Sequence, residues 1–291
     1  MEKAIKKADA LIEAMEYIRL FRGKTVLVKL GGSVLDDDDL QEKLLIDIAF
    51  MATVGIRPII VHGGGKAINR AMSDSGLEPQ WINGQRYTDE RTLAIVEHTL
   101  VRKVNAQLCQ TLKKLDCQAM GLHSMSSCVL TAEQLRPNGD NGRKIDLGFV
   151  GTVCDVNAEL LKTLCASGTI PVIAPVAINK AGGKLNVNAD NAAGRVAAAV
   201  NAEKFVSVSD THGIRSDVND PQSCISSVNA EQIKKMIEDG TISAGMLPKV
   251  DACIAALLGG VPKAHIIDGR IPHSLLLEIY TDQGIGTQII K

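Results

Sequence analysis

The fold is indicated most clearly by two glycine-rich stretches, Lys29-Leu30-Gly31-Gly32 and His62-Gly63-Gly64-Gly65. A short apolar run precedes each of them, Thr25-Val26-Leu27-Val28 before the first and Pro58-Ile59-Ile60-Val61 before the second. A buried strand that ends in glycines and turns into a helix is suited to anions, because the backbone can approach the ligand closely and the helix start offers free N–H groups. Two such strand ends, one with a lysine beside its glycines, therefore predict one site for a polyanionic ligand.

The composition is that of a globular protein with an aliphatic core. Of the 291 residues, 45% are hydrophobic but only 3% are aromatic, and 32 basic residues balance 33 acidic ones to a net charge of −1. This balance provides no general electrostatic surface for nucleic acid. No run of about eighteen apolar residues is present, so no membrane span is expected. The charged first residues do not resemble a signal peptide. We expect a cytoplasmic protein, or an organellar one whose transit peptide is absent.

Several common kinds of functional site are excluded by spacing. The seven cysteines contain no C-x-x-C pair, and their odd number in a long chain indicates free, buried thiols in a reducing compartment. The six histidines show no H-x-x-x-H metal spacing, and only His62, at a glycine-rich strand end, draws attention. The motifs of a Walker-type NTPase, a standard dinucleotide site and a serine-hydrolase elbow are all absent. No metal site made by the protein itself is expected.

Strands and helices are expected to alternate from Lys24 onwards. This order predicts a three-layer α/β/α sandwich whose mainly parallel central sheet is continuous across two lobes. We expect an N-terminal helix within 1–23, an N-terminal lobe at 24–202 and a C-terminal lobe at 203–291. The expected strands are 25–30, 57–61, 117–122, 170–175, 204–209, 263–267 and 285–290. The expected helices are 2–21, 39–54, 66–76, 89–116, 157–168, 189–201, 229–239 and 246–258, with hairpins or loops at 81–88 and 136–148.

Charged residues at the predicted strand and helix ends are candidates for chemistry. Lys29 would place its ammonium at the edge of the sheet where ligands bind, although it could also be a structural lysine. Arg86 follows a turn and could bind a carboxylate in a bidentate manner, or lie on the surface. Asn188 could cap a helix, and Asp190 could simply complement the dipole of that helix. Lys249 lies in the first turn of a helix, where a cation is unfavourable unless an anion is bound.

The motifs together resemble those of one known family. They are Gly23-Lys24-Thr25, Lys29-Leu30-Gly31-Gly32-Ser33, Ile60-Val61-His62-Gly63-Gly64-Gly65, Asn83-Gly84-Gln85-Arg86, Leu147-Gly148-Phe149-Val150-Gly151, Ile170-Pro171-Val172-Ile173-Ala174-Pro175, Asn186-Val187-Asn188-Ala189-Asp190, Gly245-Met246-Leu247-Pro248-Lys249 and Gly284-Ile285-Gly286-Thr287. This set, which spans nearly the whole chain, resembles the N-acetylglutamate kinases of the amino-acid-kinase superfamily. Aspartate, carbamate, uridylate and glutamate 5-kinases share the first lysine-glycine strand but not the whole set.

The resemblance implies a phosphoryl transfer. ATP, with Mg²⁺ carried by the nucleotide, would phosphorylate the side-chain carboxylate of N-acetyl-L-glutamate to N-acetyl-L-glutamyl 5-phosphate, the second step of arginine biosynthesis. By resemblance, Lys29 and Lys249 would stabilise the moving phosphoryl group, and Asp190 would hold both lysines in place. The acetylated substrate would be bound by Gly64, Gly65, Arg86 and Asn186. The nucleotide phosphates would be bound by Gly31, Gly32, Ser209 and Asp210.

The chain also resembles the arginine-inhibited branch of that family. There the N-terminal helix joins dimers into a hexamer, a trimer of dimers, and L-arginine binds between this helix and the C-terminal segment. By resemblance, the effector residues are Tyr17, His273, Glu278, Gly284 and Gly286. Some relatives bind the signalling protein PII, and the sequence leaves open whether this chain does. Two alternatives are a related kinase with another acceptor and a catalytically weak, arginine- or PII-responsive sensor of the same fold.

Overall fold

The central sheet is built from short aliphatic strands that are buried on both faces. In β1 (Thr25–Leu30), Val26, Val28 and Leu30 enter one hydrophobic core, while Leu27 enters the core on the other side of the sheet. The structure, a computed structural model, describes residues 1–31, 34–139, 142–217, 220, 223–242, 245–280 and 284–291. Buried strands of this kind are typical of a parallel sheet with helices on both sides.

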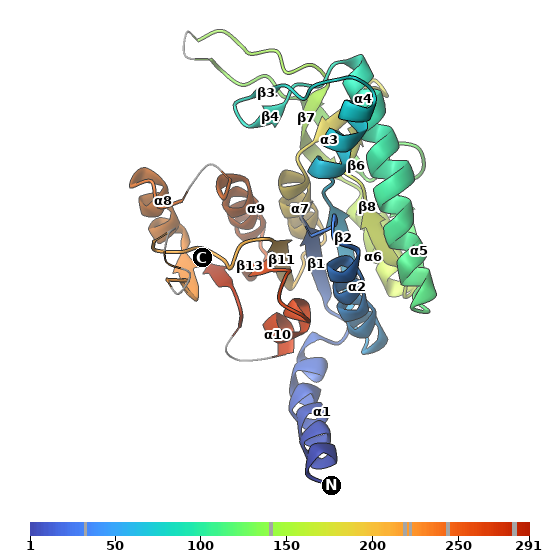
Figure 1. Cartoon of the computed structure of the whole chain (residues 1–291), viewed down its shortest axis with the longest axis vertical. Helices are drawn as coiled ribbons and strands as arrows, with labels where there is room; N and C mark the ends of the chain where they lie inside the picture. The colour runs from blue at the N-terminus through green and yellow to red at the C-terminus, as the bar shows by residue number, and fades with distance from the viewer. Residues whose placement is uncertain (32–33, 140–141, 218–219, 221–222, 243–244, 281–283) are drawn as a thin grey trace.

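The sheet runs without a break through the first and last parts of the chain (Figure 1). β1 pairs with β11 on one side and with β2 on the other, so the two predicted lobes share it. All neighbours are parallel except β13 and β14, which confirms the mainly parallel sheet. From edge to edge, the order within the described residues is β12 (Ser227–Asn229), β14 (Thr287–Ile290), β13 (Lys263–Asp268), β11 (Lys204–Ser209), β1, β2 (Arg57–His62), β8 (Ile170–Ile173) and β5 (Ala119–Leu122).

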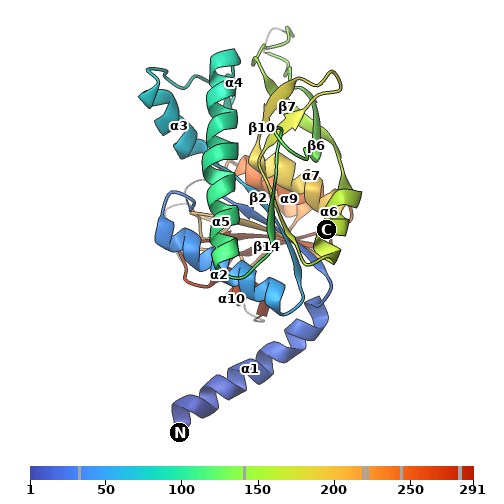
Figure 2. The ribbon, with the colours of Figure 1, turned by 90° about the vertical axis from the view of Figure 1, so that its right-hand side faces the viewer.

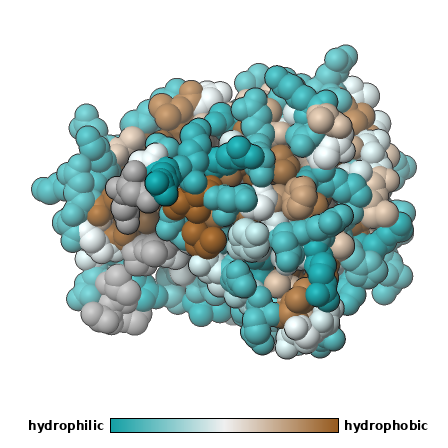
Figure 3. Space-filling view, turned by 90° about the horizontal axis from the view of Figure 1, so that it is seen from above, coloured by the Kyte–Doolittle hydropathy of each residue, from teal (hydrophilic) through white to brown (hydrophobic). Residues whose placement is uncertain are grey.

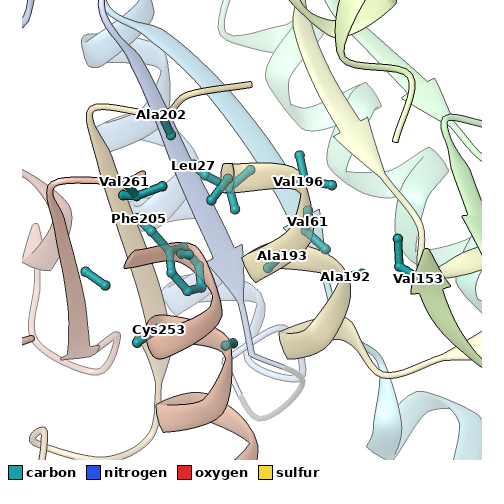
Figure 4. Close-up of a cluster of buried hydrophobic side chains, with 14 of the residues drawn as sticks. Leu27, Val61, Val153, Ala192, Ala193, Val196, Ala202, Phe205, Cys253 and Val261 are labelled. Atoms are coloured by element: carbon teal, nitrogen blue, oxygen red, sulfur yellow. The ribbon is translucent and has the colours of Figure 1, made fainter. Parts of the chain in front are cut away.

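Helices cover both faces of this sheet and complete the three predicted layers. On one face, Figure 4 shows Phe205 of β11 in one apolar cluster with Ala193 and Val196 of one helix and Cys253 of another. On the other face, Val26 and Val28 pack with Leu44 and Ile48. The helices of the first face are α6 (Ala158–Ala166), α7 (Ala189–Ala199), α8 (Ala230–Glu238) and α9 (Leu247–Leu258). Those of the second are α2 (Asp38–Thr53), α5 (Ala106–Lys114) and α10 (Ser274–Tyr280).

A small closed barrel beside the main sheet was not predicted. It joins strands in the order β10-β7-β6-β9. Of these, β10 comes last in the sequence and leads directly into α7. The strands are β6 (Leu130–Gln134), β7 (Val150–Val156), β9 (Val176–Ile178) and β10 (Lys184–Val187). Three of them have five residues or fewer, and the longer β7 includes glycine, threonine and aspartate, so none stands out as a strand in the sequence. In the structure Leu185 and Val187 of β10 are buried. The expected strand 170–175 ends earlier than predicted, at Ile173 of β8, and β9 begins just after the expected range.

The long helix expected at 89–116 is divided in three. α4 (Glu90–Glu97) passes into a π-helical segment, η1 (His98–Asn105), which passes into α5. Figure 2 shows α4 and α5 along one continuous column. The apolar periodicity of the sequence cannot distinguish a wider π-turn from the α-helix around it, and such turns occur frequently at functional sites. α3 (Gly65–Asp74) and the hairpin of β3 (Trp81–Ile82) and β4 (Gln85–Arg86) complete this end of the molecule.

The first helix, α1 (Glu2–Phe21), extends away from the rest of the molecule in two perpendicular views (Figures 1 and 2). Its apolar residues Ile5, Leu11, Ile12 and Met15 are exposed. Seen from the end opposite α1, the surface is largely hydrophilic with small separate apolar patches (Figure 3). Among the described helices, none has the length and apolar character needed to cross a membrane.

Gly194 allows α7 and α9 to pack closely, and we expect Gly194→Ala to destabilise the fold. A Cβ at this position would lie 2.6 Å from the carbonyl oxygen of Ala252 in α9. Alanine gains about 1 kcal/mol of helix propensity over glycine, but overpacking a rigid backbone contact costs about 1–3 kcal/mol. The free energy of unfolding should therefore fall by on the order of 1 kcal/mol, as measured by urea denaturation.

Gly65→Ala is the matched control, because a Cβ at Gly65 would meet no atom within 4 Å. We expect its unfolding midpoint to stay at or above that of the wild type. Equal midpoints for both variants would contradict the close helix contact.

Candidate active site

A buried ion pair lies where β1 ends and α7 begins. The Nζ atom of Lys29 is 2.8 Å from Oδ1 of Asp190, and both residues are largely buried. Lys29 points to the same face of the sheet as Leu27 because alternate side chains of a strand share a face, and α7 covers that face. Asn188 caps α7 by accepting the N–H groups of Asp190 and Asn191, as predicted, and this cap fixes the position of Asp190.

Lys249, in the first turn of α9, belongs to the same electrostatic cluster. Its pKa is lowered by burial and by the charge of Lys29, while the carboxylates of Asp190 and Asp210 oppose this shift. Its Nζ donates to the carbonyl oxygen of Gly245 at 3.0 Å, and no carboxylate of the described residues forms an ion pair with it. The structure therefore brings the two predicted lysines and Asp190 together, but only Lys29 contacts Asp190 directly.

In the first glycine stretch, the backbone N–H of Gly31 already has a partner within the protein. The N–H of Gly31 already donates to the carbonyl oxygen of Val208 at 2.9 Å, so it is not a free donor for phosphate. A Cβ at Gly31 would lie 2.8 Å from that same oxygen, and the glycine thus permits β1 and β11 to end side by side near Lys29. Gly32 lies outside the described residues.

The second glycine stretch forms the start of α3. A Cβ at Gly64 would lie 2.5 Å from Cδ2 of Leu100, so the glycine lets the Leu100 side chain of η1 pack closely against it. Gly65 faces open space. Both residues line a cavity of about 240 Å³, and the first N–H groups of a helix have no partner within the helix. This cavity also brings together Lys29, Arg86, Asn186 and Asp190, all predicted site residues.

Arg86 is a buried cation in the wall of this cavity. The turn at Asn83 and Gly84, both with positive φ, returns the β3–β4 hairpin so that Arg86 lies against Trp81, whose ring centre is 4.6 Å from the guanidinium carbon. Its Nη2 donates to Oδ1 of Asn69 at 2.6 Å, and burial lowers the pKa of the guanidinium. No carboxylate of the described residues pairs with Arg86, and a buried cation without a counter-ion favours an anionic ligand.

Asn186 lies across the cavity on the barrel strand β10. Its Nδ2 donates to Oγ1 of Thr88 at 3.1 Å, and the Thr88 hydroxyl donates to the carbonyl oxygen of Arg86. Thr88 thus links the two predicted substrate residues. The sequence analysis missed Thr88 and also Asn69, because neither belongs to a glycine-rich or charged motif.

Of the predicted nucleotide residues, Asp210 lines a second cavity of about 300 Å³, together with Thr211 and Gly213 among others. Ser209 is buried and does not line this cavity, but its hydroxyl lies 3.0 Å from that of Thr211. Arg270, which was not predicted, also lines this cavity and is held by Asp268 at 2.7 Å.

A third cavity, of about 490 Å³, lies between α1 and the C-terminal part of the chain. Of the predicted effector residues, Tyr17, Glu278, Gly284 and Gly286 line it. His273 does not line it, and its Nδ1 is 2.7 Å from the buried carboxylate of Asp47 on α2. Lys204 and His265, which the sequence analysis missed, complete the polar wall of the cavity.

Glu278 is the anionic centre of this third cavity. Burial opposes its ionisation, but hydrogen bonds from His265 and from the N–H of Ile285 and the charge of Lys204 lower its pKa overall. The Nδ1 of His265 lies 2.5 Å from its carboxylate. A buried carboxylate of this kind can receive the cationic group of a ligand.

Known proteins share this sequence and architecture. Residues 24–268 match the model of the amino acid kinase family. An acetylglutamate kinase from Symbiobacterium thermophilum is 44% identical over 291 residues, which cover 100% of this chain and 99% of the relative. Two structures of N-acetylglutamate synthase from Neisseria gonorrhoeae are also similar. One is a complex with coenzyme A and N-acetylglutamate (TM-score 0.86, 26% identity), the other a complex with coenzyme A and L-arginine (TM-score 0.82, 25% identity).

The chain covers nearly all of its kinase relatives but only 63% and 65% of the two synthase chains, while 98% of it is matched in each synthase comparison. Full-length identity to curated kinases is therefore the stronger finding. The chain belongs to the amino acid kinase family, and within it this enzyme is an acetylglutamate kinase.

Proposed function

We propose that this enzyme transfers the γ-phosphoryl group of ATP to the side-chain carboxylate of N-acetyl-L-glutamate. The observation that supports this most strongly is the buried, carboxylate-free Arg86 in the same cavity as the Lys29–Asp190 pair. One end of the cavity offers a bidentate partner for the α-carboxylate of the substrate, and the other end offers a cation for a phosphoryl group. The identity to acetylglutamate kinases supports the acetylated acceptor.

The proposed reaction needs no general base. A carboxylate oxygen of the acceptor forms a bond to the γ-phosphorus while the bond from that phosphorus to the bridging oxygen breaks, and ADP leaves with the electron pair. The acceptor is already ionised near neutral pH. Catalysis then consists of positioning two anions and stabilising charge on the moving group, which Lys29, Lys249 and the N–H groups at the start of α3 are placed to do.

The nucleotide would lie on the C-terminal side of this site, in the cavity beside Asp210 and Thr211. Residues 24–202 would then bind the acceptor and residues 203–291 the nucleotide. Among the described residues, no group of three His, Cys, Asp or Glu side chains could hold a metal ion, and Mg²⁺ enters the proposal as part of the MgATP substrate.

Regulation by L-arginine is the second part of the proposal. The cavity at α1 presents the buried carboxylate of Glu278, and a related synthase has been solved with L-arginine. Tyr17 of α1 lines this cavity, so a ligand there would touch both α1 and the C-terminal segment. The exposed apolar side chains of α1 support its contact with a second copy of the chain, as in a hexamer.

The acceptor assignment is tested by ADP release with N-acetylglutamate, glutamate, aspartate and carbamate as acceptors. We expect clear activity with N-acetylglutamate alone. Arg86→Met should lower kcat/KM for N-acetylglutamate by about 10²-fold, because it removes a bidentate, charge-assisted contact. The KM for ATP should stay within twofold of the wild-type value.

Arg70→Met serves as the matched control, since Arg70 is an exposed arginine nearby that pairs with Asp36. It should leave kcat/KM unchanged. No ADP release with any acceptor would favour the weak-sensor alternative, and equal rates with glutamate would contradict the role of the acetylated substrate.

The central ion pair gives a second prediction. Lys29→Ala or Asp190→Ala should reduce kcat by on the order of 10²-fold, a typical loss for a preorganised electrostatic group. Because the carboxylate of Asp190 opposes the lowered pKa of Lys249, its removal should lower that pKa further. The alkaline limb of the residual rate in Asp190→Ala should therefore move to lower pH.

Circular dichroism spectra of both variants should match that of the wild type, so that lost turnover is not lost folding. Near-normal kcat in either variant would refute the assigned roles. An alkaline limb at unchanged pH in Asp190→Ala would show that Lys249 does not control it.

The regulatory proposal predicts that L-arginine inhibits the wild-type enzyme and that Glu278→Gln raises the inhibitory concentration about 10-fold or more, because a buried charge-assisted hydrogen bond is weakened. The basal kcat should not change. Light scattering should give the mass of a hexamer for the wild type, and Leu11→Lys in α1 should reduce it to that of a dimer.

Glu231→Gln, an exposed change on α8, is the control, and L-arginine should inhibit this variant at the same concentration as the wild type. A wild-type dimer that loses no rate at millimolar L-arginine would overturn this part of the proposal while leaving the catalytic part intact.

A further inference from the structure

The ring of His62 is buried directly behind the second glycine stretch. His62 is the last residue of β2 and is fully buried. Its Nδ1 lies 2.9 Å from the carbonyl oxygen of Gly63, and its Nε2 lies 3.1 Å from Nδ2 of Asn105. Asn105, the last residue of η1, is also buried, and its Nδ2 lies 2.9 Å from the carbonyl oxygen of Val172 on β8. The two side chains thus connect three backbone segments.

The proton positions in this network follow from its two ends. A carbonyl oxygen only accepts, so Asn105 must turn its amide nitrogen, the donor, towards Val172. The same nitrogen faces Nε2 of His62 and donates its second hydrogen there, which leaves Nε2 without a proton. Nδ1 must then hold the proton and donate it to the carbonyl oxygen of Gly63. Burial lowers the pKa of His62 to about 4, so the ring is neutral at physiological pH.

The Gly63 carbonyl is the point at which this network reaches the site. The C=O of Gly63 and the N–H of Gly64 belong to one planar peptide unit and point in opposite directions. Holding the carbonyl towards His62 therefore directs the N–H of Gly64 to the other side, and Gly64 lines the cavity with Lys29 and Arg86. A peptide between two glycines has little conformational preference of its own, so its orientation must come from such a contact.

The π-helical segment supports the same peptide from below. Leu100 of η1 packs against Gly64 so closely that a Cβ there would lie 2.5 Å from its Cδ2 atom. Gly121 of β5 leaves room for Asn105, because a Cβ at Gly121 would lie 2.2 Å from Oδ1 of Asn105. The packing of Leu100 and the hydrogen bond of Asn105 thus come from one π-helical segment and act on one glycine turn.

We propose that His62 and Asn105 are positioning residues that hold the Gly63–Gly64 peptide with its N–H directed at the acceptor and the moving phosphoryl group. This inference rests on the proposed phosphoryl transfer. The contact of His62 is with the protein backbone, so its effect is on the geometry of a donor that acts in the transition state. It should therefore affect kcat more than the binding of ATP.

Three variants test this proposal in the ADP-release assay. His62→Leu keeps an apolar body but loses the donor, and kcat should fall by on the order of 10- to 100-fold while the KM for ATP stays within twofold. His62→Asn places an amide nitrogen near the position of Nδ1 and should recover part of that loss. Thr99→Val is the matched control, because Thr99 is equally buried in η1 but its hydroxyl has no partner among the described residues. It should retain the wild-type kcat.

A second measurement does not depend on activity. In ¹⁵N spectra of histidine-labelled wild-type enzyme, the signals that disappear in His62→Asn should show a protonated Nδ1 and an unprotonated Nε2. The opposite tautomer or an imidazolium at neutral pH would overturn the hydrogen-bond assignment, whatever the rates of the variants.

The kinetic outcomes separate this inference from the function on which it rests. A wild-type enzyme that phosphorylates N-acetylglutamate, together with a folded His62→Leu variant of unchanged kcat, would overturn the positioning role alone. Equal losses in His62→Leu and His62→Asn, or a rise in the KM for ATP that accounts for the lost rate, would also overturn it. A wild-type enzyme without activity on N-acetylglutamate would instead refute the proposed function.

Discussion

The buried ion pair of Lys29 and Asp190 is the interaction on which the rest of the site depends. Removing two charges from water costs several kcal/mol for each ion, and only close contact and further polar partners offset this cost. The 2.8 Å contact and the start of α7, where a negative charge is favoured, supply part of the compensation. β1 and α7 must therefore keep a fixed relative position. Because Gly194 lets α9 pack directly on α7, the same constraint also places Lys249.

Most of the main sheet was predictable and the barrel was not, for one physical reason. Strands such as β1 and β2 are buried on both faces, so each carries a run of apolar residues that is visible in the sequence. A strand such as β10 is four residues long and alternates Lys184 and Asn186 with apolar neighbours, which is also the pattern of many loops. Its identity as a strand arises only when the barrel closes. The π-turn of η1 was hidden for a similar reason, since α- and π-helical turns bury similar apolar faces.

The candidate site shows the same division between local and tertiary information. Lys29, Arg86, Asn186 and Asp190 stand at strand or helix ends that short motifs reveal, and the structure brings them to one cavity. Their partners are not local. The acceptor of the Gly31 N–H comes from β11, and the partner of His273 is Asp47 on α2, 226 positions away. Sequence motifs predicted which residues would line the site, but only the tertiary pairing shows which donors and charges remain available to a ligand.

The polar side chains of the site differ in charge as well as in position. Lys29, Asp190, Lys249 and Arg86 are charged and lie at or near the cavity wall, whereas His62 behind it is neutral because burial lowers its pKa to about 4. A charged imidazolium behind the glycine turn would need a counter-ion, because His62 is buried beneath the surface of the protein. A neutral ring can instead donate to the Gly63 carbonyl and accept from Asn105 without one. Charge stabilisation and backbone geometry are therefore assigned to different residues, and each can be altered without removing the other.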